Sequence, residues 1–121
     1  MNITLDHAGA SRAARLLVAS CCSAAAAGPV CQDTVVLLTS ELVTNALLHG
    51  TGRIRLGVEV GAVTVRVEVG DDDPRHPRLP EQLGGAESGR GILLVDGLAS
   101  SWGVQAGDPG KTVWFEVGAQ P

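Results

Sequence analysis

Three polar residues, Glu41, Asn45 and His49, recur at every fourth position within a largely apolar segment. Residues four apart lie on one face of a helix, so these side chains should form a row about two turns long. A carboxylate in that row could take a proton from a hydroxyl group or a water molecule, and an amide oxygen one turn away could bind Mg²⁺. The same spacing is typical of the solvent-facing side of an amphipathic helix, so the spacing alone leaves both interpretations open.

The acidic run Asp71-Asp72-Asp73-Pro74 directly follows a segment whose alternating pattern predicts a strand. A carboxylate at the end of a strand could accept a hydrogen bond from an exocyclic amine, such as that of adenine. The alternative is an acidic turn, in which aspartates cap the backbone and the proline ends the strand. A calcium loop does not fit, because the ligand spacing of an EF-hand is absent.

Two glycine-containing segments could approach a ligand closely. Gly89-Arg90-Gly91 leads into an apolar run that predicts a helix, and helix N-terminal N–H groups bind phosphate. Arg90 could add a guanidinium contact to a phosphate. Gly110-Lys111-Thr112 contains the only lysine of the chain and a hydroxyl group at the start of a predicted strand. Neither segment is specific alone, because the dinucleotide fingerprint and the Walker motif are both absent.

The hydrophobic pattern predicts the elements that must position these residues. It predicts a short strand over 3–6, helices over 8–27, 33–49 and 91–99, and strands over 53–60, 63–69, 101–105 and 112–117. The intervening stretch from residue 70 to residue 90 is rich in glycine and proline, which is typical of a functional loop. The order of elements predicts one domain over residues 1–121 with an α+β fold. We expect a two-layer sandwich, with the helices on one face of a mixed or antiparallel sheet.

Composition excludes several classes of function. The chain has 121 residues, of which 45% are hydrophobic and 18% charged, as in a single globular domain. A net charge of −4 and only three aromatic residues argue against binding of nucleic acid. Gly28-Pro29 interrupts the only long uncharged stretch, so no membrane span is expected.

The cysteines Cys21, Cys22 and Cys31 lack the spacing of a zinc site. We interpret them as buried or half-buried thiols of a reducing compartment, and we expect a cytoplasmic protein. Residues 18–21 also resemble a lipoprotein processing site. The apolar stretch before that site is too short for secretion, which makes this alternative remote.

Taken in order, these segments resemble the GHKL ATPase superfamily, and within it the stand-alone anti-sigma-factor serine kinases and small ATP-binding regulatory proteins. The similarity covers roughly residues 10–117. The matching segments are Ser40–Ala46 with His49-Gly50, Val67–Val69 leading to Asp71, Gly89–Gly91 with Leu94-Val95, and Gly110–Phe115. The chain departs from the superfamily's Asp-x-Gly-x-Gly motif. Both glycines are missing, because Asp71 is followed by Asp72, Asp73, Pro74 and Arg75.

The resemblance implies an ATP-binding site with Mg²⁺. In it Glu41 would be the general base toward a protein serine or a water molecule, and Asn45 would coordinate Mg²⁺ at the ATP phosphates. Asp71 would bind the adenine amine. The other residues that it places in the nucleotide site are His49, Gly89, Arg90, Gly91, Lys111 and Thr112, with an ATP lid over roughly residues 72–90.

The resemblance also implies partners. The chain would phosphorylate an anti-anti-sigma (STAS-type) protein, bind a sigma factor, and form a homodimer. One alternative is a non-catalytic module of the same fold that binds nucleotide or sequesters a partner, which the missing glycines suggest. Another is a detached histidine-kinase catalytic domain, which we disfavour because no helix pair with a phosphoacceptor histidine precedes the predicted domain.

Overall fold

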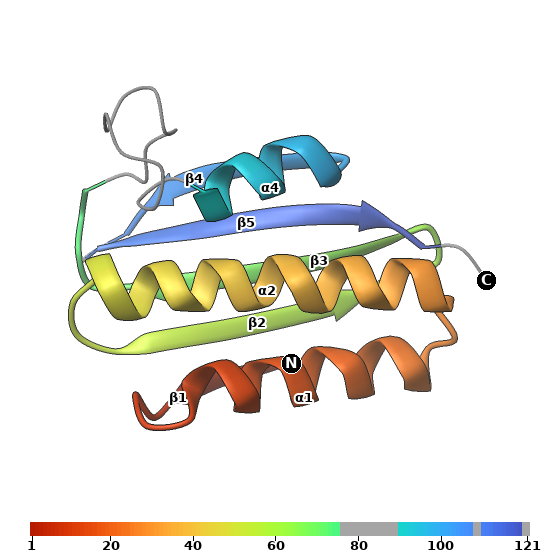
Figure 1. The fold of residues 1–121 in the computed structure, drawn as a ribbon, viewed down its shortest axis with the longest axis horizontal. Coiled ribbons are helices and arrows are strands. Elements are labelled where there is room, and N and C mark those ends of the chain that lie inside the picture. Colours follow the sequence, from red (N-terminus) through yellow and green to blue (C-terminus); the bar gives the residue numbers. More distant parts are fainter. Residues whose placement is uncertain (76–89, 108–109, 120–121) are drawn as a thin grey trace.

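The computed structural model describes residues 1–75, 90–107 and 110–119, and the structural statements below refer to these residues. The elements are β1 (Asn2–Leu5), α1 (Ala10–Ala24), α2 (Pro29–His49), β2 (Ile54–Val60), β3 (Thr64–Asp71), α4 (Arg90–Leu98), β4 (Ser101–Ala106) and β5 (Lys111–Gly118). The strands form one sheet in the order β1-β2-β3-β5-β4, and every neighbouring pair is antiparallel. Figure 1 shows α2 between α1 and α4 on one face of this sheet. The predicted α+β two-layer architecture is therefore confirmed, with a fully antiparallel sheet.

The core lies between the sheet and the helices. Alternate residues of β3, Val65, Val67 and Val69, are buried against it, as the period of two predicts. Phe115 of β5 is fully buried in the same layer. Along α1 the buried residues follow each other at every fourth position, and they are Ala10, Ala14, Val18 and Cys22. Such spacing gives α1 one apolar face, which packs on α2 and the sheet.

Helix α2 starts at Pro29, four residues before the predicted start at Asp33. Proline suits the first turn of a helix, because its missing N–H would have no intrahelical partner there. Gly28 precedes it at φ 94°, a conformation that favours glycine. Gly28-Pro29 therefore ends one helix and begins the next, and α2 becomes the longest element of the fold as described.

Strands β3 and β5 extend beyond their predicted bounds at the end of the sheet that carries the acidic run. Strand β3 continues to Asp71, and β5 begins at Lys111, because these two residues pair across the sheet. Gly110, which precedes β5, has φ 86°, and a Cβ there would lie 1.9 Å from the backbone oxygen of Asp71. Only glycine fits this tight approach, which brings the start of β5 against the end of β3.

Three sequence expectations concern the cysteines, a membrane span and the predicted lid. Cys22 and Cys31 are buried and Cys21 is half-buried, all as free thiols, and burial raises the pKa of Cys22 to about 11. No helix in the described ranges combines the length and the apolarity needed to cross a bilayer. Most of the predicted lid, residues 76–89, lies outside the described part of the chain.

Candidate functional site

The first turn of α4 lies directly against the polar row on α2. A Cβ placed on Gly91 would lie 3.2 Å from Asn45 Nδ2 and 3.2 Å from Glu41 Oε2. Both α2 side chains are half-buried. The structure thus brings together the carboxylate, the amide and the glycine that two separate segments of the sequence predicted. Because Gly91 has no side chain, the backbone of α4 approaches the two polar groups closely.

The groups present fit a Mg²⁺ ion held together with phosphates. Mg²⁺ usually takes one or two protein oxygens and fills its other positions with water and substrate phosphate. Asn45 can supply one amide oxygen. It lies beside the N-terminus of α4, where the free backbone N–H groups suit an anion such as phosphate. A single amide oxygen cannot hold Mg²⁺ firmly, so the ion would bind only with the phosphates.

Asp71 lies at the other end of the row, beside the residue that follows α2. A Cβ on Gly50 would lie 2.7 Å from Asp71 Cγ, so a side chain there would displace the carboxylate. Both Asp71 oxygens accept hydrogen bonds from Lys111 Nζ at 3.0 Å, and the backbone N–H of Asp73 donates to Oδ1 at 2.8 Å. The two side chains of this ion pair are 5% and 8% exposed. Asp71 is therefore held as a buried hydrogen-bond acceptor in an ion pair with Lys111.

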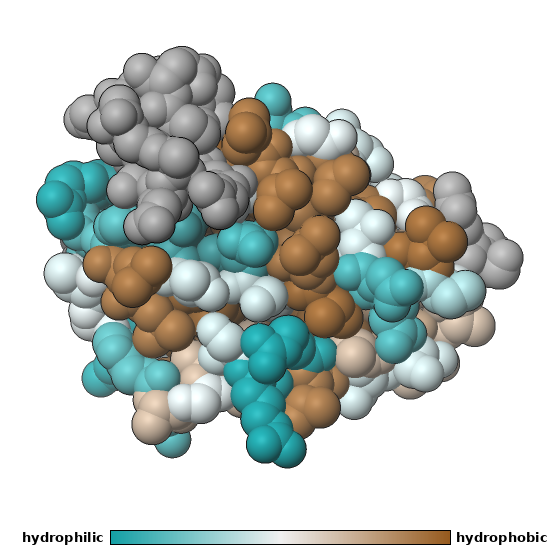
Figure 2. Space-filling view, viewed as in Figure 1, coloured by the Kyte–Doolittle hydropathy of each residue, from teal (hydrophilic) through white to brown (hydrophobic). Residues whose placement is uncertain are grey.

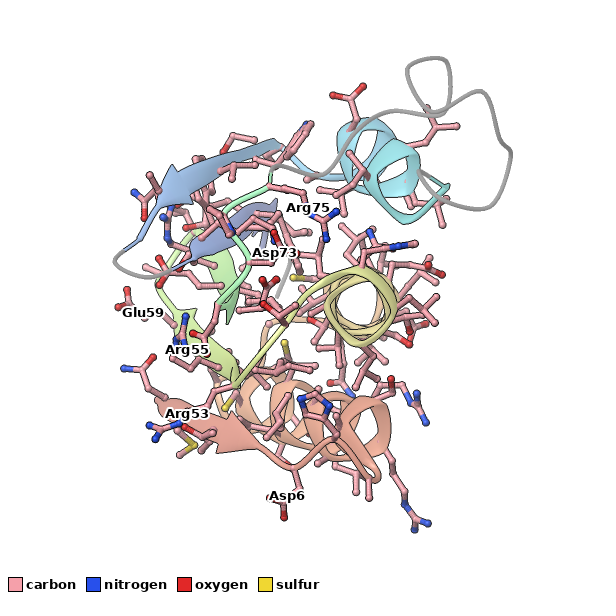
Figure 3. All side chains as sticks on the ribbon, turned by 90° about the vertical axis from the view of Figure 1, so that its left-hand side faces the viewer. Asp6, Arg53, Arg55, Glu59, Asp73 and Arg75 are labelled. Carbon is pink, nitrogen blue, oxygen red and sulfur yellow. The ribbon has the colours of Figure 1, made fainter. Side chains whose placement is uncertain are left out.

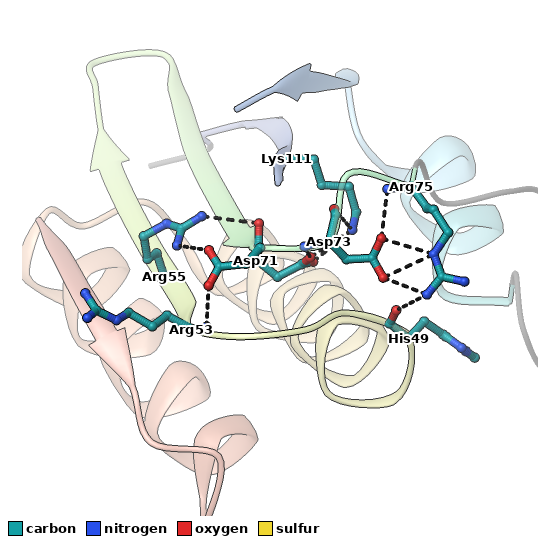
Figure 4. Close-up of polar contacts among 8 residues, drawn as sticks. His49, Arg53, Arg55, Asp71, Asp73, Arg75 and Lys111 are labelled. Atoms are coloured by element: carbon teal, nitrogen blue, oxygen red, sulfur yellow. Dashed lines mark hydrogen bonds and ion pairs between the residues drawn. The ribbon is translucent and has the colours of Figure 1, made fainter. Parts of the chain in front are cut away.

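The remaining two acidic residues point to other cations (Figure 4). Asp72 accepts from the backbone N–H of Arg53 at 3.0 Å and from Arg55 Nη1 at 3.0 Å, and these contacts lower its pKa. Asp73 accepts from Arg75 Nη2 at 2.6 Å. Figure 3 shows Arg53, Arg55, Asp73 and Arg75 at the same end of the molecule. Because each aspartate of the run has its own basic partner, their charges are locally compensated.

The acidic-turn alternative is confirmed for the backbone of this run. The N–H of Asp73 donates to Asp71 Oδ1, and the N–H of Arg75 donates to Asp73 Oδ1 at 2.9 Å. Each carboxylate thus caps the N–H two residues ahead, as in Asx turns. Asp73 and Arg75, which take part in these turns, stand at the two positions where the resemblance expects glycines.

We expect this turn to make stability depend on pH in the acid range. The side chain of Arg75, and then its backbone N–H, lower the pKa of Asp73 well below its usual value. The folded chain therefore binds this proton less tightly than the unfolded chain does. The stabilisation is complete above about pH 5 and is lost as the pH falls through about 4 and below.

Urea unfolding between pH 7 and pH 3 measures this effect. In Asp73→Asn the loss of stability on acidification should be smaller than in the wild type. Asp6→Asn is the control, because Asp6 is exposed and lies away from the turn (Figure 3). If the free energy of unfolding depends on pH equally in the wild type and Asp73→Asn, Asp73 is not the source of the acid sensitivity.

Other predicted site residues lie elsewhere. The side chain of His49 is exposed and points away from the acidic turn (Figure 4), while its backbone oxygen accepts from Arg75 Nη2 at 3.5 Å. Thr112 follows Lys111 in β5, so its side chain lies on the face of the sheet opposite Asp71. There it lines a hollow of about 300 Å³ with Arg55 and Glu68. The structure thus does not bring Thr112 to the Asp71 side, where the resemblance placed it.

Two candidates of the glycine segment cannot be placed. Gly89 lies outside the described residues, and the side chain of Arg90 is also outside them. Their roles therefore stay predictions. Gly91 is the member of this segment whose surroundings the structure describes.

Sequence reasoning missed Arg55 and Arg75 as partners of the acidic run. The spacing of Asp73 and Arg75, two residues apart across a proline, was a local signal for an Asx turn with an ion pair. Arg55 carried no comparable signal. The alternation of its strand predicts that the side chain of Arg55 points outward. Its pairing with Asp72, however, depends on the register of β2 against β3.

The approach of α4 to α2 makes a matched pair of glycine substitutions informative. Gly91→Ala places a methyl group 3.2 Å from Glu41 and Asn45, so these side chains must shift. We expect affinity for MgATP to fall about tenfold, or about 1.4 kcal/mol, with the fold intact. Isothermal titration calorimetry measures the affinity.

Gly97→Ala in the same helix is the control. A Cβ on Gly97 meets nothing within 4 Å, so the substitution should leave nucleotide affinity unchanged. It should raise stability by up to about 1 kcal/mol through helix propensity. Equal affinity losses in both variants would show that α4 acts through helix stability and not through contact with α2.

Comparisons with known proteins were made with the whole chain. Residues 4–117 match the family model described as the histidine kinase-like ATPase domain. An uncharacterized protein of Streptomyces coelicolor is 38% identical over 88 residues, which are 68% of this chain and 83% of the relative.

Two solved structures resemble the fold. The RsbU and RsbW domains of Rv1364c from Mycobacterium tuberculosis align with a TM-score of 0.76 and 22% identity, over 100% of this chain and 33% of that one. The histidine kinase domain of the Erythrobacter litoralis EL346 blue-light activated histidine kinase aligns with a TM-score of 0.53 and 29% identity. That alignment covers 71% of this chain and 43% of the other. The chain thus spans less than half the length of either solved structure.

Proposed function

The chain belongs to the family of histidine kinase-like ATPase domains, and from this premise we propose that it is an ATP-binding serine/threonine protein kinase of the anti-sigma-factor type. Its activity would regulate transcription in the cytoplasm through a sigma factor and an anti-anti-sigma (STAS-type) antagonist. One observation carries the proposal. The carboxylate of Glu41 and the amide of Asn45 meet the glycine at the start of α4, and the N–H groups of a helix N-terminus suit a phosphate.

In such a reaction each of four described residues would have a separate role. Asn45 would hold Mg²⁺ at the phosphates, and Gly91 would let the backbone approach them. Glu41 would accept the proton of the attacking serine hydroxyl or water. Asp71 would accept a hydrogen bond from the adenine amine. MgATP supplies the phosphoryl group, so the protein contributes position and charge.

The length of α2 supports this division. Four residues separate Glu41 from Asn45, and five more reach Gly50, which touches Asp71. At 1.5 Å per residue the row spans about 13 Å along the helix. A general base at one end and an acceptor at the other would thus contact opposite ends of one extended nucleoside triphosphate.

The helical surface favours association with another protein. Figure 2 shows apolar atoms gathered in a band over α4 and the middle of α2. The exposed leucines of these helices are Leu37, Leu48, Leu93 and Leu98, with exposed fractions of 41%, 70%, 51% and 49%. Exposed apolar patches of this kind often mark protein contacts. This observation also favours the second candidate function, a module of the same fold that sequesters a partner without chemistry.

Two measurements test the proposal. Calorimetry of the purified chain should show binding of MgATP, and labelled ATP should transfer phosphate to a serine of a co-purifying STAS-type protein. Binding without transfer, together with partner capture that is unchanged in Glu41→Ala, would favour the sequestering module. Absence of MgATP binding would contradict the kinase proposal, and label on a partner histidine would favour a histidine-kinase activity.

A further inference from the structure

The guanidinium of Arg75 is held in one orientation by a buried carboxylate. Nε donates to both carboxylate oxygens of Asp73 at 3.1 Å, and Nη2 donates to Oδ2 at 2.6 Å. The side chain of Asp73 is 5% exposed, whereas that of Arg75 is 79% exposed. A forked ion pair of this kind fixes the plane of the guanidinium, so its exposed edge has a defined direction.

The exposed edge of Arg75 retains free donors. A guanidinium carries five N–H groups, of which two belong to Nη1. The contacts to Asp73 use Nε and Nη2, and Nη2 also lies 3.5 Å from the backbone oxygen of His49. Nη1 makes no hydrogen bond to any residue that the structure describes. Its two N–H groups can therefore serve a ligand.

Arg75 lies beside the polar row of α2. The backbone oxygen that it approaches belongs to His49, the last residue of α2, which is one turn or about 6 Å beyond Asn45. Figure 3, which views α2 end-on, shows Arg75 on the side of this helix where α4 lies. Gly91 of α4 meets Asn45 on that side. The free donors thus lie near the candidate site, between Asn45 and the end of the row at Asp71.

The other two cations of the acidic run do not offer donors there. Lys111 Nζ lies 3.0 Å from each of Asp71 Oδ1, Asp71 Oδ2 and the backbone oxygen of Asp73, so all three of its protons are used. Arg55 lines the hollow on the opposite, outer face of the sheet. Arg75 is therefore the basic partner of this run that a ligand on the helix side can reach.

We propose that Arg75 binds the α-phosphate of the nucleotide through Nη1, an inference that rests on the proposed nucleotide-binding function. Mg²⁺ at Asn45 would hold the outer phosphates, and one helical turn towards Asp71 is the place of the phosphate next to the nucleoside. A guanidinium donates charge-assisted hydrogen bonds to phosphate oxygens. Because the resemblance expects a glycine at residue 75, this contact would distinguish the chain from members that have the glycine.

The test compares AMP with adenosine, which differ by the α-phosphate alone. NMR titration of the whole chain without Mg²⁺ measures both affinities, so that the metal site takes no part. The wild type should bind AMP at least about tenfold more tightly than adenosine, as expected for a hydrogen bond to a charged group. In Arg75→Gln the two affinities should agree within about threefold, with the affinity for adenosine unchanged. A merely structural role of Arg75 would instead lower both affinities.

Two further variants serve as controls. Arg75→Gln leaves the buried carboxylate of Asp73 without its cation, so the double variant Asp73→Asn/Arg75→Gln separates the phosphate contact from that effect. The double variant should lose the preference for AMP equally, and it replaces Arg75→Gln if the latter does not fold. Arg53→Gln removes an exposed cation at the same end of the molecule (Figure 3) and should keep the preference.

Several results would overturn the inference. One is an unchanged preference for AMP in folded Arg75→Gln. Another is a preference restored in the double variant, since the loss would then come from the unpaired carboxylate. An equal loss in Arg53→Gln would point to net charge, and a wild type that binds MgATP but does not prefer AMP over adenosine would exclude the contact. A wild type that binds no adenine nucleotide would instead refute the proposed function itself.

Discussion

Asn45→Ala is expected to lower the affinity for MgATP by about 100-fold, or about 2.8 kcal/mol, and to remove the dependence of ATP binding on Mg²⁺. The amide of Asn45 can supply a hard oxygen ligand, and its Nδ2 lies 3.2 Å from the position of a Cβ on Gly91, at the N-terminus of α4. Alanine removes this ligand without changing the helix, because it has high helix propensity. Calorimetry of ATP with Mg²⁺ and with EDTA measures both effects.

Gln32→Ala provides a matched control. Gln32 is a half-buried amide of the same helix, 13 residues from Asn45 and therefore about 20 Å along the axis. Its loss should leave MgATP affinity and Mg²⁺ dependence as in the wild type. Equal, Mg²⁺-dependent affinity in Asn45→Ala and the wild type would remove Asn45 from the metal site.

Glu41→Gln should retain MgATP binding and lose phosphoryl transfer by about 100- to 10,000-fold, the usual contribution of a general base. Glutamine has the size of glutamate and can keep the packing against Gly91, but it cannot accept the proton of the attacking hydroxyl. The measurement is the rate of single-turnover transfer of label from bound ATP to the STAS-type protein, or to water where no acceptor is present.

Glu59→Gln is the control for the loss of one negative charge, since Glu59 is an exposed acid on β2 (Figure 3). It should transfer phosphate at the wild-type rate. A Glu41→Gln variant that still labels its acceptor at that rate would exclude Glu41 as the base. If the wild type binds MgATP but transfers no phosphate, the protein is a non-catalytic binding module of the same fold.

The predicted superfamily and the predicted sheet with its helices are both confirmed, and local pattern explains why. Alternation in β2 and β3 reflects one buried face, and the four-residue spacing on α1 reflects one packed side. Element ends were less predictable. Pro29 begins α2 although proline usually interrupts helices, and β3 gains Gly70 and Asp71 through pairing with β5.

Part of the candidate site could also be predicted from local pattern, and part depended on packing. The row of Glu41, Asn45 and His49 followed from helical spacing, because residues four apart share a face in any helix. That the first two meet Gly91 depends on how α4 packs on α2, which no local pattern encodes. The resemblance placed Thr112 beside the adenine, whereas the pairing of β3 with β5 turns Lys111 to that side and Thr112 away from it.

The sequence by itself determined the elements, the order of the fold and the polar row on α2, because these depend on neighbours a few residues apart. Only the tertiary structure decided the state of the acidic run. Its carboxylates are paired with cations 2, 17 and 40 residues away, on three different segments. Strand register and burial choose such partners, so a run that carries three negative charges in sequence is compensated by three cations in the folded protein.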